Sequence, residues 1–216
     1  MKLVLAFDPP GRKHGTKRVA AGFALILASM VILFRVPAKY FAATTFLSMA
    51  CMLAVSYEMG LSWTARPRPK AVLAGVASAC VLYLVFLLGN AGIANLHPLG
   101  IGSSNEASVY SLIASRSNPL YLQAAMLVFD SAGYESFFRG VLQARLNPRL
   151  GIGSAPLVAA VDSFIHVITL NPLWVATTFV ADLTWGLTYY YSKGLWASFT
   201  SHLLWDFAIF VLFPIR

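Results

Sequence analysis

The groups in this sequence most capable of chemistry are carboxylates and imidazoles that lie inside apolar stretches. Five of the eight acidic residues and two of the four histidines fall in the last four such stretches: Asp130, Glu135, Asp162, His166, Asp182, His202 and Asp206. A carboxylate at the centre of a bilayer is costly unless it is paired or hydrated. Their accumulation in four consecutive segments therefore predicts a common polar cavity.

The spacing of these groups predicts how they meet. Three pairs stand four residues apart and so share a helix face: Glu135 with Arg139, Asp162 with His166, and His202 with Asp206. At a helical rise of about 1.5 Å per residue, their positions in the segments fall in one layer near the middle of a membrane. We expect these faces to turn toward one another around a small hydrated cavity.

A cavity of this kind could activate water. A carboxylate beside an imidazole can act as a general base, and a second imidazole with a carboxylate can stabilise an oxyanion. This is the chemistry of a hydrolase without a serine or cysteine nucleophile, and it needs no cofactor. Two histidines and a carboxylate could instead bind a divalent metal such as zinc, although the sequence has no His-Glu-x-x-His motif.

The composition places this chemistry in a membrane. Of the 216 residues, 58% are hydrophobic and 11% are charged, against about 25% charged in an ordinary soluble domain. These values exclude a disordered protein and disfavour a soluble enzyme. The net charge of +8 would suggest nucleic acid in a soluble protein. Here the basic residues flank apolar runs, so we attribute the charge to membrane orientation and expect no nucleic-acid partner.

The apolar runs predict an all-α polytopic transmembrane helical bundle of seven or eight spans. The seven runs cover residues 19–34, 40–57, 71–96, 120–146, 154–169, 173–191 and 195–215. A polar segment at 97–118 follows the third run and could hold a short interfacial helix at 107–114. We expect a single membrane domain over 1–216, in which 1–118 supplies the N-terminal spans and a linker and 119–216 carries the polar motifs.

Lys and Arg are distributed unevenly over the connections between these runs. Eleven lie in the N-terminal tail and after the second, fourth and sixth runs, and four lie on the other side. Because positive residues favour the cytosolic side, this predicts seven spans, a cytosolic N-terminus and a location in the cell membrane. The basic tail is similar to the start of a signal peptide, but no clear cleavage site follows the first run, so we expect a retained span.

Three short motifs resemble those of the CPBP intramembrane proteases, which include the type II CAAX prenyl endopeptidases and their bacteriocin-processing relatives. Tyr-Glu-Ser-Phe-Phe-Arg-Gly at 134–140 resembles the family's Glu-Glu-x-x-Phe-Arg-Gly. Asp-Ser-Phe-Ile-His at 162–166 resembles Phe-x-x-x-His, and His-Leu-Leu-Trp-Asp at 202–206 resembles His-x-x-x-Asn/Asp. The resemblance covers about residues 120–210 and implies an endopeptidase that acts on a membrane-anchored or lipidated polypeptide.

The resemblance also implies roles. In the family, the first Glu of the pair and the second-motif His orient the attacking water, and the third-motif His and Asn/Asp stabilise the oxyanion. Carried over, His166, His202 and Asp206 take these functional positions, and Glu135 and Arg139 form the supporting pair. These five residues are the candidate catalytic residues.

One position departs from the family pattern. Tyr134 stands where the family has its water-activating glutamate, and a tyrosine, with an ordinary pKa of about 10, is a poor base at neutral pH. Glu135 is turned by about 100° around the helix and cannot simply replace it. Two other carboxylates could approach the water: Asp130, one turn earlier on the same face, and Asp162, in place of the second-motif Phe.

Three functions stay open at this point. The foremost is an intramembrane endopeptidase. The alternative is a non-catalytic relative that has lost its base and binds or stabilises a membrane partner. The third is a proton-coupled transporter, because carboxylates and histidines near the middle of a membrane also form proton relays. Asp182 has no counterpart in the family motifs, and we expect it to be a hydrogen-bonded partner inside the bundle.

Overall fold

A computed structural model describes residues 16–35, 40–61, 66–94 and 119–215. Every element in these ranges is helical, as predicted. The interfacial helix expected at 107–114 and most of the basic N-terminal tail lie outside the described residues.

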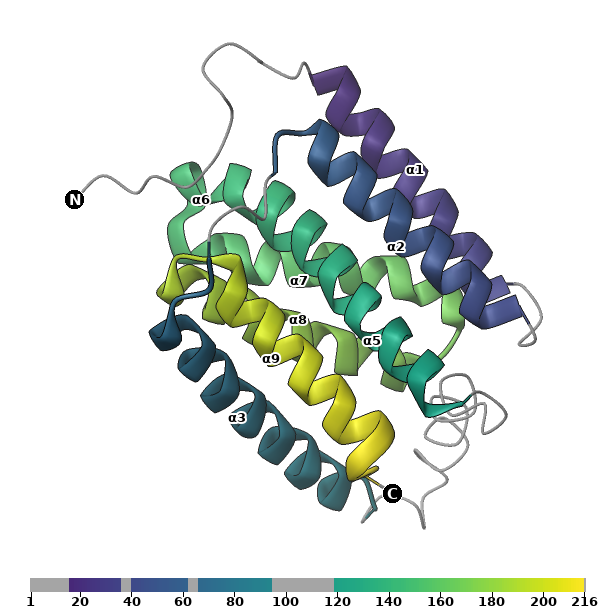
Figure 1. Cartoon of the computed structure of the whole chain (residues 1–216), viewed down its shortest axis with the longest axis vertical. Coiled ribbons are helices and arrows are strands. Elements are labelled where there is room, and N and C mark those ends of the chain that lie inside the picture. The colour runs from purple at the N-terminus through teal and green to yellow at the C-terminus, as the bar shows by residue number, and fades with distance from the viewer. Residues whose placement is uncertain (1–15, 36–39, 62–65, 95–118, 216) are drawn as a thin grey trace.

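The described chain folds into helical rods, and the first three rods are the single helices α1 (Thr16–Arg35), α2 (Phe41–Glu58) and α3 (Pro69–Ala94). They lie on two sides of the molecule (Figure 1). α1 and α2 form an antiparallel hairpin that packs on the fourth rod, and α3 packs along α9. α3 and α9 (Leu195–Phe207) approach closely at Gly75, where an added Cβ would lie 2.5 Å from the Ala197 carbonyl oxygen.

The rest of the described chain forms four further helical rods, the fourth to the seventh in chain order, and these carry the polar motifs. The fourth rod is continuous from α5 (Leu120–Tyr134) through a π-helical segment, η3 (Glu135–Gln143), into α6 (Ala144–Leu150). A 3-10 turn, η4 (Gly151–Gly153), reverses the chain into α7 (Ser154–Ile165), which ends in a second 3-10 turn, η5 (His166–Thr169). α8 (Pro172–Ser192) follows, and α9 continues into a short π-helix, η6 (Ala208–Leu212).

Local sequence explains both turns that set the direction of α7 and α8. Gly151 adopts φ 54°, a conformation that glycine reaches without a Cβ penalty, where α6 gives way to α7. Asn171 caps α8, since its side-chain oxygen accepts from the backbone N–H groups of Leu173 and Trp174 at 3.0 and 3.2 Å. Pro172 occupies the first helical position, where its missing N–H costs nothing.

Two apolar clusters form the core. One joins α1, α2, the fourth rod and α7 through side chains such as Met49, Phe137 and Val158. The other joins α3, α8 and α9 through side chains such as Leu82 and Trp205. The polar motifs line a cavity whose walls come from both clusters, so packing on either side fixes the positions of the ionisable groups.

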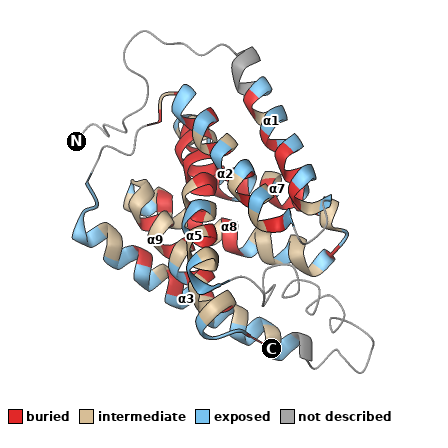
Figure 2. Ribbon diagram, turned by 45° about the vertical axis from the view of Figure 1, so that its right-hand side comes forward, coloured by how far each residue is buried: buried red, intermediate tan, exposed pale blue. Residues whose placement is uncertain are grey.

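The outer surfaces are apolar, as a lipid-facing surface requires. On α3, Leu73 and Leu88 are 69% and 72% exposed, and Figure 2 shows exposed residues along the outer sides of α1 and α3. Within the described residues, four segments are long and apolar enough to cross a bilayer: Phe41–Glu58, Pro69–Gly92, Leu120–Thr169 and Leu195–Leu212. The third of these holds two antiparallel rods, and a shorter apolar helix covers Ala20–Arg35. The figure of seven or eight spans therefore stays a prediction.

Candidate active site

The π-helical segment η3 lies at the centre of the bundle and carries two of the predicted site residues, Glu135 and Arg139. Eight of its nine residues are buried, so this segment is enclosed on all sides. A π-helix is rare, and where it occurs inside an α-helix it is frequently found at a functional site.

Arg139 is the centre of a buried polar cluster. Its guanidinium donates from Nη2 to the Asp182 carboxylate and from Nη1 to Gln143 Oε1 at 3.3 Å. Gln143 in turn donates to the Gly186 carbonyl oxygen at 2.8 Å, which ties η3 to α8. Glu135 Oε2 lies 3.8 Å from Arg139 Nε. Asp182 is thus the hydrogen-bonded partner that we predicted.

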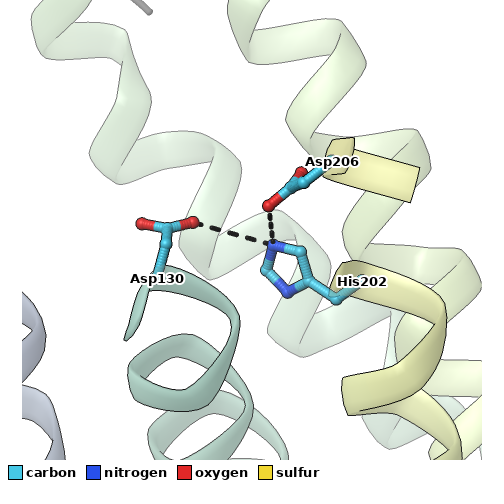
Figure 3. A group of neighbouring side chains, drawn as sticks. All are labelled: Asp130, His202 and Asp206. Carbon is cyan, nitrogen blue, oxygen red and sulfur yellow. Dashed lines mark ion pairs between the residues drawn. The ribbon is translucent and has the colours of Figure 1, made fainter. Parts of the chain in front are cut away.

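His202 connects this cluster to the cavity. Its Nδ1 is hydrogen-bonded to Glu135 Oε1 at 3.0 Å. Its Nε2 faces two carboxylates, Asp206 at 3.4 Å and Asp130 at 3.8 Å (Figure 3). The ring stacks on Trp185 with centroids 3.6 Å apart and an interplanar angle of 13°. The imidazole is therefore fixed in plane and in direction.

His166 occupies a second position, on the other side of Tyr134. Its Nδ1 donates to the Asp162 carbonyl oxygen at 2.9 Å, and the Asp162 carboxylate lies 3.6 Å from the same nitrogen. Because Nδ1 carries the proton, Nε2 is free to accept from the Tyr134 hydroxyl, which lies 3.3 Å away. The Tyr134 ring also meets the His202 ring, with centroids 6.0 Å apart.

One cavity of about 150 Å³ joins these groups. Its ionisable lining comprises Asp130, Tyr134, Asp162, His166, His202 and Asp206, and the rest of its wall is mainly aromatic and aliphatic. Since a water molecule takes up about 30 Å³ of liquid, the space can hold several waters.

The five predicted site residues divide into two groups. His166, His202 and Asp206 line the cavity, whereas Glu135 and Arg139 lie behind it. All three pairs predicted from the four-residue spacing are in contact, at 3.4 to 3.8 Å. The Glu135–Arg139 pair is the loosest, and neither Glu135 Oε2 nor Arg139 Nε makes a hydrogen bond to a described residue.

Sequence reasoning missed three contributors to the site. The first is the Tyr134 hydroxyl as a partner of His166, and the second is Trp185 as the platform for His202. The third is Gln143, whose position four residues after Arg139 was a usable signal. Nothing in the spacing predicted the other two contacts, because they join different helices.

The family model for type II CAAX prenyl endopeptidases, Rce1-like, matches residues 116–208. This match supports a CPBP-family assignment for that part of the chain. The matched range includes all of α5 and ends at Ala208, and it contains every ionisable residue of the cavity lining. No curated protein and no solved structure matches the chain.

The match over residues 116–208 supports an intramembrane CAAX-type protease kind of function. The matched family is one of intramembrane proteases of the CAAX type, and it fits the long apolar helices of a multi-pass membrane protein. Its substrates are membrane-anchored, which is consistent with a membrane-anchored polypeptide as the partner.

Proposed function

We propose that this CPBP domain is an intramembrane endopeptidase that hydrolyses a peptide bond in a membrane-anchored or lipidated polypeptide. The observation that carries the proposal is the single cavity that collects two imidazoles, three carboxylates and a phenol between apolar walls. Apolar walls lower the local dielectric, which strengthens each electrostatic contact with a developing charge.

The carboxylates that gather around His202 support a role in activating water. Asp130 and Asp206 both face His202 Nε2, and both line the cavity. Of the two candidates for the missing base, the geometry favours Asp130, whose side chain is 28% exposed. The Asp162 side chain is 2% exposed and lies beside His166 Nδ1, which already donates to a backbone carbonyl oxygen.

Tyr134 and His166 support a role on the opposite side of the reacting carbonyl. In this role the Tyr134 hydroxyl turns its one proton from His166 Nε2 to the oxyanion, and such donation is strongest where water is excluded. In this arrangement the roles are the reverse of those in the family site. His202 and its carboxylates activate the water, and Tyr134 with His166 holds the oxyanion. The reason is that position 134, where the family has its glutamate, is a tyrosine here, whereas Asp130 supplies a carboxylate beside His202.

The test is cleavage by the purified protein in lipid nanodiscs. Single-span peptides with and without a C-terminal farnesyl group serve as substrates. We expect a cleaved product that is lost in His166→Ala and in His202→Ala and reduced at least a hundredfold in Asp130→Asn. The exposed Glu58→Gln on α2 is the control and should cleave like the parent protein. Saturable peptide binding without any product would instead favour the non-catalytic relative.

A further inference from the structure

The cavity reaches the surface at one end of the bundle. We name this the Leu170 end, after the exposed residue between α7 and α8, and the opposite end, where α8 meets α9, the Lys193 end. The half-buried members of the cavity lining are Phe34, Asp130, Trp174, Thr177, Thr178 and Phe210. All six lie in the halves of their rods nearest the Leu170 end, whereas the other lining residues are buried. The Phe34 ring meets the rings of His166 and Trp174 at centroid distances of 5.2 and 5.4 Å, so the ends of three rods meet there.

The Arg139 cluster closes the cavity toward the Lys193 end. Along the fourth rod, the last lining residue is Tyr134, and Arg139 and Gln143 follow it, both 0% exposed. Along α8, which runs in the same direction, the last lining residue is Trp185, and the buried Gly186 follows it. A Cβ on Gly186 would lie 3.2 Å from both Arg139 Nη1 and Gln143 Oε1, so the cluster fills the space between the two rods.

Basic side chains gather at the closed end. Among the described residues, the exposed or half-buried Lys and Arg side chains there are Arg66, Arg68, Lys70, Arg145, Arg149 and Lys193. At the Leu170 end, the described part of the chain has one, Arg35. Because Lys and Arg favour the cytosolic side, this asymmetry and the eleven-to-four division in the sequence assign the Lys193 end to the cytosol and the Leu170 end to the other side.

A polypeptide that enters from the Leu170 end follows the cavity itself. The lined part of α8, from Trp174 to Trp185, extends about 17 Å and ends at the ring that stacks on His202. A polypeptide that enters from the Lys193 end would have to separate Arg139 from Asp182, whose side chains are both 1% exposed. Separating a buried ion pair is strongly unfavourable, because each charge is left without its partner.

We infer that the substrate of this site is a translocated polypeptide, which presents its scissile bond in the half of the membrane away from the cytosol. The inference rests on the proposed endopeptidase function and adds the side of the membrane from which the substrate enters. The rim of the cavity fits an apolar segment of such a polypeptide. Phe34 and Trp174 offer aromatic rings there, Thr177 offers a methyl group, and no described Lys or Arg lines the cavity.

The first measurement determines the side of access without requiring catalysis. The full-length protein, with Cys51 and Cys80 replaced by alanine, is labelled in sealed right-side-out and inside-out vesicles with a membrane-impermeant thiosulfonate. We expect Thr177→Cys at the rim to react at least tenfold faster from the non-cytosolic side, and Lys193→Cys to react from the cytosolic side. Thr184→Cys, on the same helix but outside the cavity lining, is the matched control and should react slowly from either side.

The second measurement asks from which side a peptide is cleaved. A pool of farnesylated peptides of mixed sequence is added to both kinds of vesicle, and a charged dye keeps each peptide in the leaflet to which it is added. We expect product to form at least tenfold faster in right-side-out vesicles, and at equal rates in both after solubilisation in detergent. Vesicles that contain His166→Ala give the background from other proteases.

Reaction of Thr177→Cys from the cytosolic side would overturn the inference, and Lys193→Cys then distinguishes an inverted bundle from a cavity that opens at the Lys193 end. Faster cleavage in inside-out vesicles would also overturn it, while leaving the endopeptidase in place. Rim access from the non-cytosolic side without any product in detergent would instead overturn the endopeptidase, and with it the substrate, while the side of access stands.

Discussion

Arg139 and Asp182 form the ion pair that holds the interior of the site together. Both side chains are 1% exposed, so removing the carboxylate leaves a guanidinium without its main partner in a dry interior. We expect Asp182→Ala to lower the free energy of unfolding by about 3–5 kcal/mol. Asp182→Asn, which keeps the shape and one acceptor, should cost clearly less. Thermal unfolding followed by circular dichroism measures both, and equal stability of parent and Asp182→Ala would contradict the pair's role.

Tyr134 allows the phenol to be tested apart from its ring. The ring stacks on Phe138 with centroids 5.3 Å apart, so Tyr134→Phe should fold normally while it loses the hydroxyl that faces His166. If this hydroxyl holds the oxyanion, turnover should fall by about 10²–10³, with little change in KM. Steady-state cleavage of one peptide substrate gives both constants. Unchanged turnover would remove Tyr134 from the mechanism.

At the residue scale, the sequence could predict partners along one helix but not partners across helices. The contacts of Glu135 with Arg139 and of His202 with Asp206 follow from four-residue spacing alone. The contacts of Glu135 with His202 and of Arg139 with Asp182 depend on how three rods pack, and no local pattern encodes that. Glu135 is not among the residues that line the cavity, and its inability to replace Tyr134 stays a prediction.

At the element scale, α3 offers two glycines with opposite surroundings. A Cβ on Gly75 would collide with α9, lying 2.5 Å from the Ala197 carbonyl oxygen and 2.7 Å from Thr200 Cβ, whereas a Cβ on Gly89 meets nothing within 4 Å. We expect Gly75→Ala to destabilise the protein by about 1–3 kcal/mol through overpacking. Gly89→Ala should be neutral or stabilising by up to about 1 kcal/mol, because alanine favours the helix.

Denaturant or thermal unfolding of the two variants in the same detergent decides this prediction. Each variant serves as the control for the other, since both make the same change in the same helix. If Gly89→Ala were as destabilising as Gly75→Ala, close contact between α3 and α9 would not be what limits stability at position 75.

The limits of the helices were largely predictable, but their internal geometry was not. The run expected at 173–191 is α8 (Pro172–Ser192), because a capping Asn171 and the proline mark its start. The run expected at 120–146 is longer, ends at Leu150, and contains the π-helical segment η3. In a π-helix the backbone hydrogen bonds span five residues instead of four. This difference in bonding changes neither composition nor hydropathy, so the apolar pattern of the sequence does not predict it.

At the scale of the whole molecule, α8 is the rod that most needs a membrane test. It is absent from the four described segments that qualify as spans by length and composition, yet its 21 residues extend about 30 Å, the thickness of a bilayer core. Its one charged side chain, Asp182, is buried inside the bundle, as is Tyr189. Asp182 is paired with Arg139, and a helix whose charged group is paired inside the bundle can cross lipid with modest mean hydropathy.

The residues flanking α8 turn this argument into a prediction about topology. Lys193 and Leu170 are exposed at opposite ends of the helix. In a background with Cys51 and Cys80 replaced by alanine, we expect a membrane-impermeant maleimide to label Lys193→Cys only from the cytosolic side and Leu170→Cys only from the other. This follows from the eleven-to-four division of Lys and Arg. Labelling of both from one side would mean that α8 does not span, whereas the reverse pattern would keep the span and invert the whole bundle.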